Sequence, residues 1–402
     1  MTTYRQLFGI REFRALFAGS AVTVAGSTAQ MLALAALVYG LTGSPVLAAV
    51  AYLGGFAPQT VGVLLLGGLA DRVRPRRAVA AWDTVRASVA AALAIGVLPV
   101  WAMLALVLVA GAGDALAGAI RNALLVDVLT TDAYVLGRST LNIAVGGMQI
   151  VGYGVGGVLL ATVGPFGALW FAAGAPLTGA LVSRLGLRER RPRSSGRTGA
   201  RAGVAATWRG HRTLLREPAM RALLLALWLP NGLIVGAEAL YVPYAGPAAG
   251  LLFAAAAAGM LAGDVAVGRW TSAPVRARLA RPLYLLLALP YAVFALRPAP
   301  VLAAVVVGVA SLGYAGHLGL QERLVVILPE TMRGQGFALA GSGMMTAQAL
   351  CAASAGLLAE GIGPAYAMTA AGVVSVATTL ILFRRLPVPG STTTPGIATH
   401  VR

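Results

Sequence analysis

Five charged residues fall within the last seven positions of GGLADRVRPRR, residues 67–77: one aspartate and four arginines. The stretch that leads into them, residues 54–70, carries no charge, and only 11% of the whole chain is charged. Arginines placed directly after an apolar run are typical of a membrane-spanning helix whose loop stays on the cytoplasmic side. We therefore predict a membrane protein and examine the rest of the chain for further spans.

The composition supports a chain that crosses the membrane many times. Its 402 residues are 58% hydrophobic, and the mean hydropathy is +0.81. Such a chain has too little polar surface to cover a soluble domain. The single cysteine, Cys351, lies in an apolar segment, which excludes a disulfide framework and a thiolate metal site.

Apolar segments long enough to cross a bilayer occur in two groups of six, separated by a polar stretch at 188–218. About 20 residues are needed, because a helix rises 1.5 Å per residue through roughly 30 Å of hydrocarbon. The first segment is too long for a signal peptide, so we predict an uncleaved helix. The twelve predicted spans are 15–40, 45–70, 78–97, 100–122, 139–161, 166–187, 220–243, 246–268, 281–297, 300–321, 336–360 and 365–383.

The arginines provide an independent test of this count. All 31 basic residues are arginines, and if the N-terminus is cytoplasmic, every one except Arg297 falls on the cytoplasmic side of the twelve spans. A wrong number of spans in either half would destroy this alternation. We predict that both termini are cytoplasmic, and that the net charge of +18 reflects orientation on an anionic membrane surface rather than nucleic-acid binding.

The polar middle stretch divides into two parts. Residues 188–203, rich in Arg, Pro, Ser and Gly, predict a flexible linker. After it, Val204, Trp208, His211 and Leu215 recur at helical spacing, which predicts a helix in the cytoplasmic interface that joins the two halves. The predicted units are an N-terminal six-helix bundle at 1–187, this linker with its helix at 188–218, a C-terminal six-helix bundle at 219–384 and a flexible tail at 385–402.

The second half contains a copy of part of the first. Shifted by 199 residues, the segment 148–165 lies over 347–364 and matches at five positions. Because six helices are an even number, the copies keep the same orientation, as in transporters whose two bundles rock about an axis along the membrane normal. The matched pairs are Gln149 and Gln348, Gly157 and Gly356, Leu159 and Leu358, Gly164 and Gly363, and Pro165 and Pro364.

The opening stretch resembles motif A of the major facilitator superfamily, which lies between the second and third helices. Five of its residues match the motif in spacing, and Arg74 replaces the usual second glycine. The second half carries a weaker copy, GDVAVGRW, at 263–270. The matching residues are Gly67, Asp71, Arg72, Arg76 and Arg77.

Other segments resemble the drug-export branches of this superfamily, including macrolide and siderophore exporters. They are WDTVRA at 82–87, AIRNALLVDVL at 119–129 and LPETMRGQGFAL at 328–339. GYGVGG at 152–157 resembles the antiporter motif C, with Tyr153 where proline is expected. The resemblance implies an all-α fold of twelve transmembrane helices in two bundles related by a pseudo-two-fold axis, and export of a small compound.

Charged residues at the cytoplasmic helix ends are candidates for a gate between the halves. Single exposed ion pairs contribute little, so only a network can bias the conformational equilibrium. The alternative is that these arginines serve topology alone. The candidates are Gly67, Asp71, Arg72, Arg76, Arg77, Asp83, Arg86, Asp127 and Arg138; Gly152, Gly156 and Gly157 are candidates for close helix packing.

Proton coupling requires an ionisable group inside the membrane. Asp114 lies about 21 Å from the outer end of the fourth span, and Arg121, two turns later on the same face, is its expected partner. His317 in the tenth span is a second candidate for carrying the proton. Alternatively, Asp114 is a structural residue and His317 a packing residue.

Several polar and aromatic side chains in the spans are candidates for a substrate cavity. Glu238 belongs to the outer part of the seventh span and either binds substrate or pairs with Arg297. Asp264 is expected to belong to the weaker copy of the gate. The cavity candidates are Gln30, Gln59, Asn142, Gln149, Trp228, Glu238, Tyr314 and Gln348.

A protease is a remote alternative. GAGD at 111–114 reproduces the Gly-x-Gly-Asp signature of intramembrane aspartyl proteases, but these need a second aspartate, usually after tyrosine, and the chain has no Tyr-Asp pair. Nothing in the sequence indicates a cofactor, a metal site or a nucleotide-binding domain. The sequence predicts a monomeric secondary transporter in the inner (plasma) membrane, not an enzyme, that exchanges a small hydrophobic or cationic compound for protons. The alternative is a proton-coupled importer or facilitator on the same fold.

Overall fold

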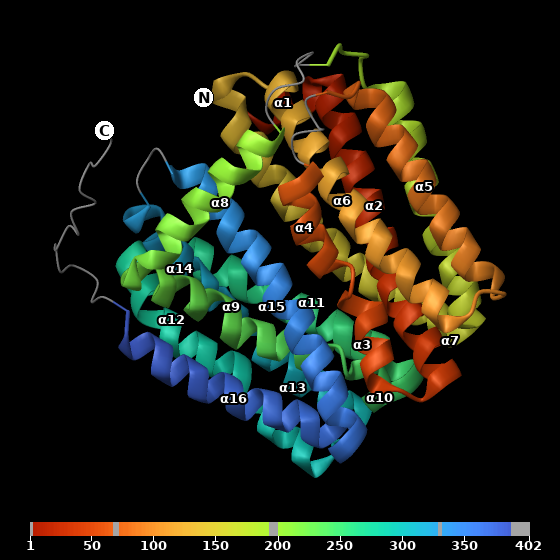
Figure 1. Cartoon of the computed structure of the whole chain (residues 1–402). Coiled ribbons are helices and arrows are strands. Elements are labelled where there is room, and N and C mark those ends of the chain that lie inside the picture. Colours follow the sequence, from red (N-terminus) through yellow and green to blue (C-terminus); the bar gives the residue numbers. More distant parts are fainter. Residues whose placement is uncertain (1–2, 67–71, 193–199, 329–331, 387–402) are drawn as a thin grey trace.

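The computed structural model describes residues 3–66, 72–192, 200–328 and 332–386, and nearly all of them lie in helices (Figure 1). No strand occurs in these ranges. The short α1 (Tyr4–Gly9) begins with a capping box between Thr3 and Gln6. The rest of the N-terminal half consists of α2 (Arg11–Thr42), α3 (Pro45–Leu53), α4 (Phe56–Leu66), α5 (Pro75–Ile95), α6 (Val100–Val128) and α7 (Thr131–Gly186).

The C-terminal half follows α8 (Ala200–Arg216) and has the same general build. Several of its spans are interrupted by one 3₁₀ turn or a short break, where glycine or proline disturbs the helix. Its elements are α9 (Pro218–Glu238), α10 (Tyr241–Ala245), η2 (Gly246–Ala248), α11 (Ala249–Trp270), α12 (Ala273–Ala288), η3 (Leu289–Leu296), α13 (Pro300–Leu312), η4 (Gly313–Ala315), α14 (Gly316–Ile327), α15 (Arg333–Ile362) and α16 (Pro364–Arg384).

These helices are consistent with the twelve spans that the sequence predicts. Within the described residues, 9 segments are long and apolar enough to cross a membrane. Two of them, Ala144–Gly186 and Pro218–Trp270, each cover two predicted spans. The predicted second span is divided into α3 and α4 by a break at Gly54 and Gly55, so neither piece reaches spanning length by itself.

Two glycines make the same turn in each half. The backbone of Gly164 has φ 70°, and that of Gly363 has φ 83°. Glycine adopts such positive φ values at no steric cost, and the proline that follows each one is suited to begin the next helix. The turn between the fifth and sixth spans is thus repeated between the eleventh and twelfth. This agrees with the sequence match between segments 148–165 and 347–364, which are 199 positions apart.

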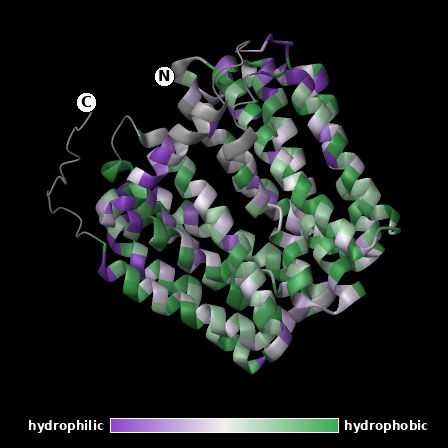
Figure 2. Cartoon of the chain, in the orientation of Figure 1, coloured by the Kyte–Doolittle hydropathy of each residue, from purple (hydrophilic) through white to green (hydrophobic). Residues whose placement is uncertain are grey.

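The bundle has two chemically different ends. We call the end that holds α1, residues 72–77 and α8 the arginine-rich end, and the end that holds the turns at Gly43 and Gly363 the far end (Figure 1). Hydrophilic residues gather at the arginine-rich end, whereas the helices below it are mostly hydrophobic (Figure 2). This is the distribution that a polytopic membrane protein needs.

The two halves meet along two seams. On one seam, Ser44 Oγ donates a hydrogen bond of 2.5 Å to Glu360 Oε1 at the far end, and Thr60 Oγ1 donates one of 3.1 Å to the Ser342 carbonyl oxygen. On the other seam, a Cβ added at Gly157 in α7 would lie 2.6 Å from Gly250 Cα in α11. A Cβ at Gly147, closer to the arginine-rich end of α7, would meet no atom within 4 Å. Gly157 is seven residues before Gly164, whose turn matches the far-end turn at Gly363, so this close contact lies about 10 Å along α7 from that turn.

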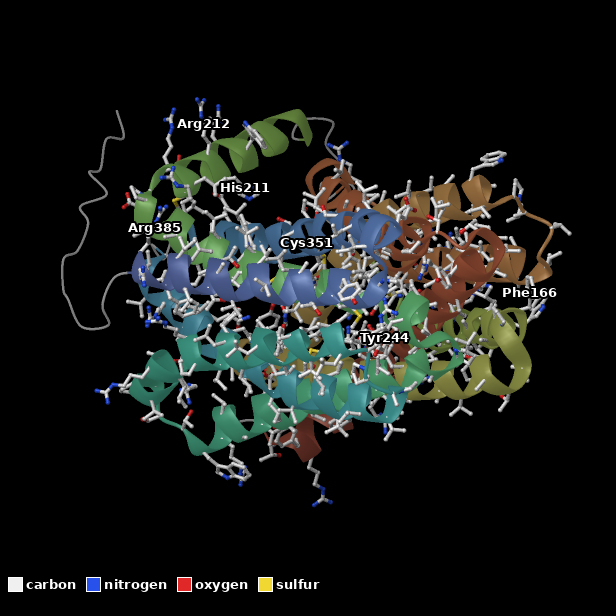
Figure 3. All side chains as sticks on the ribbon, turned by 90° about the horizontal axis from the view of Figure 1, so that it is seen from below. Phe166, His211, Arg212, Tyr244, Cys351 and Arg385 are labelled. Carbon is white, nitrogen blue, oxygen red and sulfur yellow. The ribbon has the colours of Figure 1, made fainter. Side chains whose placement is uncertain are left out.

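Helix α8 crosses the arginine-rich end and contacts α4 of the first half as well as α9 and α15 of the second. His211 and Leu214 are buried, whereas Trp208 and Arg212 are exposed. Figure 3 shows Arg212 projecting away from the bundle and His211 directed toward it. Burial lowers the pKa of His211, which keeps this imidazole neutral at physiological pH.

Candidate functional site

Glu238 is a buried carboxylate at the end of α9. It lies about 30 Å along the helix from Pro218, and α9 ends there before the chain turns into α10. Only 8% of the residue is exposed. No ion pair or hydrogen bond joins its side chain to another described residue. Intramembrane carboxylates are costly, and one without a partner indicates a functional group rather than a structural one.

Two pairs of tyrosines, one pair in each half, lie within electrostatic range of this carboxylate. The phenols of Tyr52 in α3 and Tyr153 in α7 are hydrogen-bonded at 2.7 Å, and those of Tyr241 and Tyr291 in the second half at 2.6 Å. Phe253 of α11 joins the two pairs: its ring stacks on the Tyr153 ring at 4.9 Å and lies 4.9 Å from the Tyr241 ring. The charge of Glu238 acts on all four tyrosines. We call Glu238, these tyrosines and Phe253 the tyrosine site.

The tyrosine site is suited to a positive charge. An electron-rich ring face attracts a cation, and a buried carboxylate supplies the opposite charge. Arg297, which the sequence offered as a structural partner of Glu238, instead lies over the Tyr366 ring at 5.1 Å from its centroid. The Glu238 carboxylate is therefore left without this cation.

A second charged cluster lies inside the N-terminal half. Trp82 Nε1 donates a hydrogen bond of 2.9 Å to Asp114 Oδ1, and Arg86 Nε lies 3.5 Å from the same oxygen. Arg121 forms an ion pair with Asp83 of α5. The predicted pairing of Arg121 with Asp114 is thus wrong, because Arg121 points across to α5 and not along its own helix. We call Asp83, Arg86, Asp114 and Arg121 the charged quartet.

His317 and Tyr314 lie together in the C-terminal half. Their rings stack at 4.4 Å, and His317 Nδ1 lies 2.9 Å from the Tyr314 carbonyl oxygen. The same nitrogen is 3.6 Å from Asp264 Oδ1. Asp264, expected to belong to a gate, therefore faces His317 on a neighbouring helix.

The arginine-rich end carries a further network, part of which the sequence analysis missed. Arg190 binds Glu12 through two hydrogen bonds of 2.7 and 2.9 Å, and Arg77 lies 3.5 Å from Glu189. The Glu12 carboxylate raises the pKa of Arg190. The signal for these partners was the presence of acids inside an arginine-rich stretch, but spacing alone could not connect residues 178 positions apart.

For two of the remaining gate candidates, Arg138 and Asp127, the interactions given for the described residues involve only the first half and the arginine-rich stretch that follows it. Arg138 donates a hydrogen bond of 3.0 Å to Asn122 Oδ1, and both lie in the first half. Asp127 acts electrostatically on Arg190, which lies in the arginine-rich stretch after the first half. Gly67 and Asp71 lie outside the described residues. Arg72 lies three residues before Pro75, the first residue of α5, and Arg76 is the second residue of that helix.

The predicted cavity side chains are dispersed. Trp228 Nε1 donates a hydrogen bond of 2.9 Å to the Ala340 carbonyl oxygen and so ties α9 to α15. Gln30 is buried, and its Oε1 has no hydrogen-bond partner in the described part of the chain. Gln59 and Gln348 are half-buried, Gln149 is exposed, and the side chain of Asn142 lies outside the described residues.

The three glycines of the GYGVGG segment lie at close helix contacts. A Cβ at Gly152 would lie 2.6 Å from the Ala25 carbonyl oxygen, and one at Gly156 would lie 3.0 Å from Ala29 Cα, both in α2. Gly157 faces Gly250 instead. Tyr153, which stands where motif C has proline, belongs to the tyrosine site.

Comparison with known proteins places this fold and these sites in a family. The family model described as Major Facilitator Superfamily matches residues 16–325, more than half of the chain. The chain therefore belongs to the Major Facilitator Superfamily. None of the curated proteins compared with the sequence is significantly similar to it.

Solved transporter structures share the fold of this superfamily member at low sequence identity. A POT family transporter in complex with a thioalcohol-conjugated peptide has a TM-score of 0.71 at 12% identity, covering 93% of this chain and 96% of the other. The xylose transporter XylE from E. coli in its inward-open conformation has a TM-score of 0.67 at 14% identity, covering 95% and 96%. A D-xylose-proton symporter has a TM-score of 0.67 at 14% identity, covering 93% and 98%. The chain is thus a polytopic membrane protein with a transporter fold.

Proposed function

We propose that this protein is a proton-coupled exporter of small hydrophobic cations that works by alternating access as a monomer in the inner membrane. The observation that carries the proposal is Glu238, a buried carboxylate without a cationic partner in the described chain, with tyrosines of both halves within its electrostatic range. A site between two mobile halves is where an alternating-access transporter holds its cargo.

The substrate class follows from the walls of the tyrosine site. Four phenol rings and Phe253 provide flat apolar surface, and Glu238 provides one negative charge. A compound with an apolar body and one positive charge matches both features. A proton can neutralise the same carboxylate once the cation has left, so the empty site need not keep a buried charge.

The direction of transport is inferred from orientation and sequence. Arginines are retained on the cytoplasmic side, so the arginine-rich end and both termini face the cytoplasm. The halves make their close seam contact at Gly157 toward the far end, which leaves loading from the cytoplasm as the favoured step in this conformation. The likeness of the fold to XylE in its inward-open conformation and the resemblance of GYGVGG to motif C support the same proposal.

Equilibrium binding of ethidium and tetraphenylphosphonium to the purified protein tests the tyrosine site. Replacing Glu238→Gln keeps the size of the side chain and removes its charge, so we expect affinity for both cations to fall about 100-fold. Glu360→Gln is the matched control: it removes the other carboxylate near the far end, leaves an amide oxygen that accepts from Ser44, and leaves affinity unchanged. Unchanged binding in Glu238→Gln contradicts the proposed site.

A further inference from the structure

Asp83 is more deeply buried than its partners in the charged quartet. Its side chain is 2% exposed, against 12% for Arg86, 23% for Arg121 and 35% for Asp114. Arg121 pairs with Oδ1 of Asp83. The other oxygen, Oδ2, is buried and has no hydrogen-bond partner in the residues that the structure describes. A buried polar atom left in this way costs free energy and indicates a water, an ion or a functional proton.

A second unpartnered polar atom lies beside the same point. Thr23 Oγ1 of α2 is also buried without a partner in the described chain. A Cβ added at Gly179 of α7 would lie 2.8 Å from Thr23 Oγ1 and 3.4 Å from Asp83 Oδ2. Both oxygens therefore border the space that the missing glycine side chain leaves. Arg121 lies on the other oxygen of Asp83, which makes a metal cation at this point unfavourable.

We propose that Asp83 Oδ2 binds the proton that drives export. This inference rests on the proposed function, because it assigns the coupled proton. An O–H bond forms at Oδ2, Asp83 becomes neutral, and Arg121 keeps its charge but loses its ion pair. The charged quartet then changes from a formal charge of zero to +1. The ion pair in this structure is the state in which the proton has been released.

The charges around Asp83 set the balance between its two states. Arg121 and Asp114 face it from α6, and Arg86 faces it from its own helix, α5. The neighbouring helices α2 and α7 contribute the uncharged Thr23 and Gly179 at Oδ2. Arg121 favours the ionised form of Asp83, and Asp114 opposes it. Asp114, the most exposed member of the quartet, is the one that water reaches most readily.

Infrared titration of the purified protein tests the proton site without any transport. Acidification produces the carbonyl band of a protonated, buried carboxylic acid, and we expect Asp83→Asn to remove one such band while Asp114→Asn retains it. Arg121→Gln removes the neighbouring positive charge, so the band persists to higher pH in that variant. The inference is overturned if Asp83→Asn leaves every titrating band in place.

Vesicle transport connects the site to coupling. We expect Asp83→Asn to lower ethidium uptake driven by a proton gradient by about tenfold, while ethidium exchange without a gradient stays within about twofold, because Asp83 is not part of the tyrosine site and the Glu238 carboxylate is in the other half. Arg121→Gln folds with Asp83 protonated and moves the pH profile of uptake toward higher pH. Gradient-driven uptake that is unchanged in Asp83→Asn overturns the inference. If wild-type uptake does not depend on the gradient while the infrared band is present, the proposed proton-coupled function is refuted and only proton binding at Asp83 remains.

Discussion

Glu238 and Asp83 are both buried carboxylates in membrane helices, yet their surroundings are opposite. Asp83 shares a charged quartet with two arginines inside one half of the molecule. Glu238 has tyrosines from both halves around it and no cation from the described chain. The fold compensates the charge of Asp83 by itself, whereas no described residue compensates the charge of Glu238, and we propose that a ligand does so. Burial alone therefore does not identify a substrate site. A buried charge without a partner between the two halves is the stronger indication.

Among the variants considered, one that prevents the two halves from closing at the tyrosine site should have the largest effect on transport. At Gly157 even an added Cβ would lie only 2.6 Å from Gly250 Cα. The larger side chain of Gly157→Leu therefore prevents α7 and α11 from forming their close contact beside the tyrosine site. We expect ethidium transport to fall to background. Gly154→Leu is the control, because a Cβ there meets nothing within 4 Å. Distances between spin labels at positions 155 and 251 measure the seam, and normal closure in Gly157→Leu would refute the assigned contact.

Removing the Asp83 carboxylate should lower the free energy of unfolding, whereas removing the Glu238 carboxylate should not. Asp83→Leu leaves Arg121 partly buried without its ion pair, and we expect unfolding free energy to fall by about 3 kcal/mol. Glu238→Leu leaves no cationic side chain without its partner, and it replaces an unpaired carboxylate with an apolar side chain. We therefore expect the free energy of unfolding to be unchanged or higher. Thermal unfolding in detergent compares the two variants. Equal losses would mean that Glu238 has a structural partner after all.

A smaller change in stability measures how much the hydrogen bond from Trp82 to Asp114 contributes to the charged quartet. Trp82→Phe removes the hydrogen bond from Nε1 to Asp114 and retains most of the ring, so we expect a loss of about 1 kcal/mol in unfolding free energy. Trp208→Phe, at an exposed position of α8, serves as the control and should change nothing measurable. Denaturant titration resolves the difference. A loss in Trp208→Phe as large as in Trp82→Phe would show that the hydrogen bond is not the cause.

The fold was more predictable than the sites. Twelve spans follow from apolar length and from the arginines, since both depend on the bilayer and not on which helices touch. The repeated Gly-Pro turns at 164 and 363 were visible as an internal match. The partner of Arg121 was not predictable, because helical spacing identifies neighbours on one helix and its partner lies on another. The tyrosine site combines residues from six helical segments, and no periodicity connects Tyr52 to Phe253.

The direction of proton flow tests the central claim most directly. In inside-out vesicles the cytoplasmic, arginine-rich end faces the medium, so export appears as ethidium uptake into the lumen. The account predicts that an acidic lumen drives this uptake in the wild-type protein and that Glu238→Gln abolishes it. Uptake that instead requires an acidic medium, with protons entering alongside the cation, would contradict exchange and identify an importer.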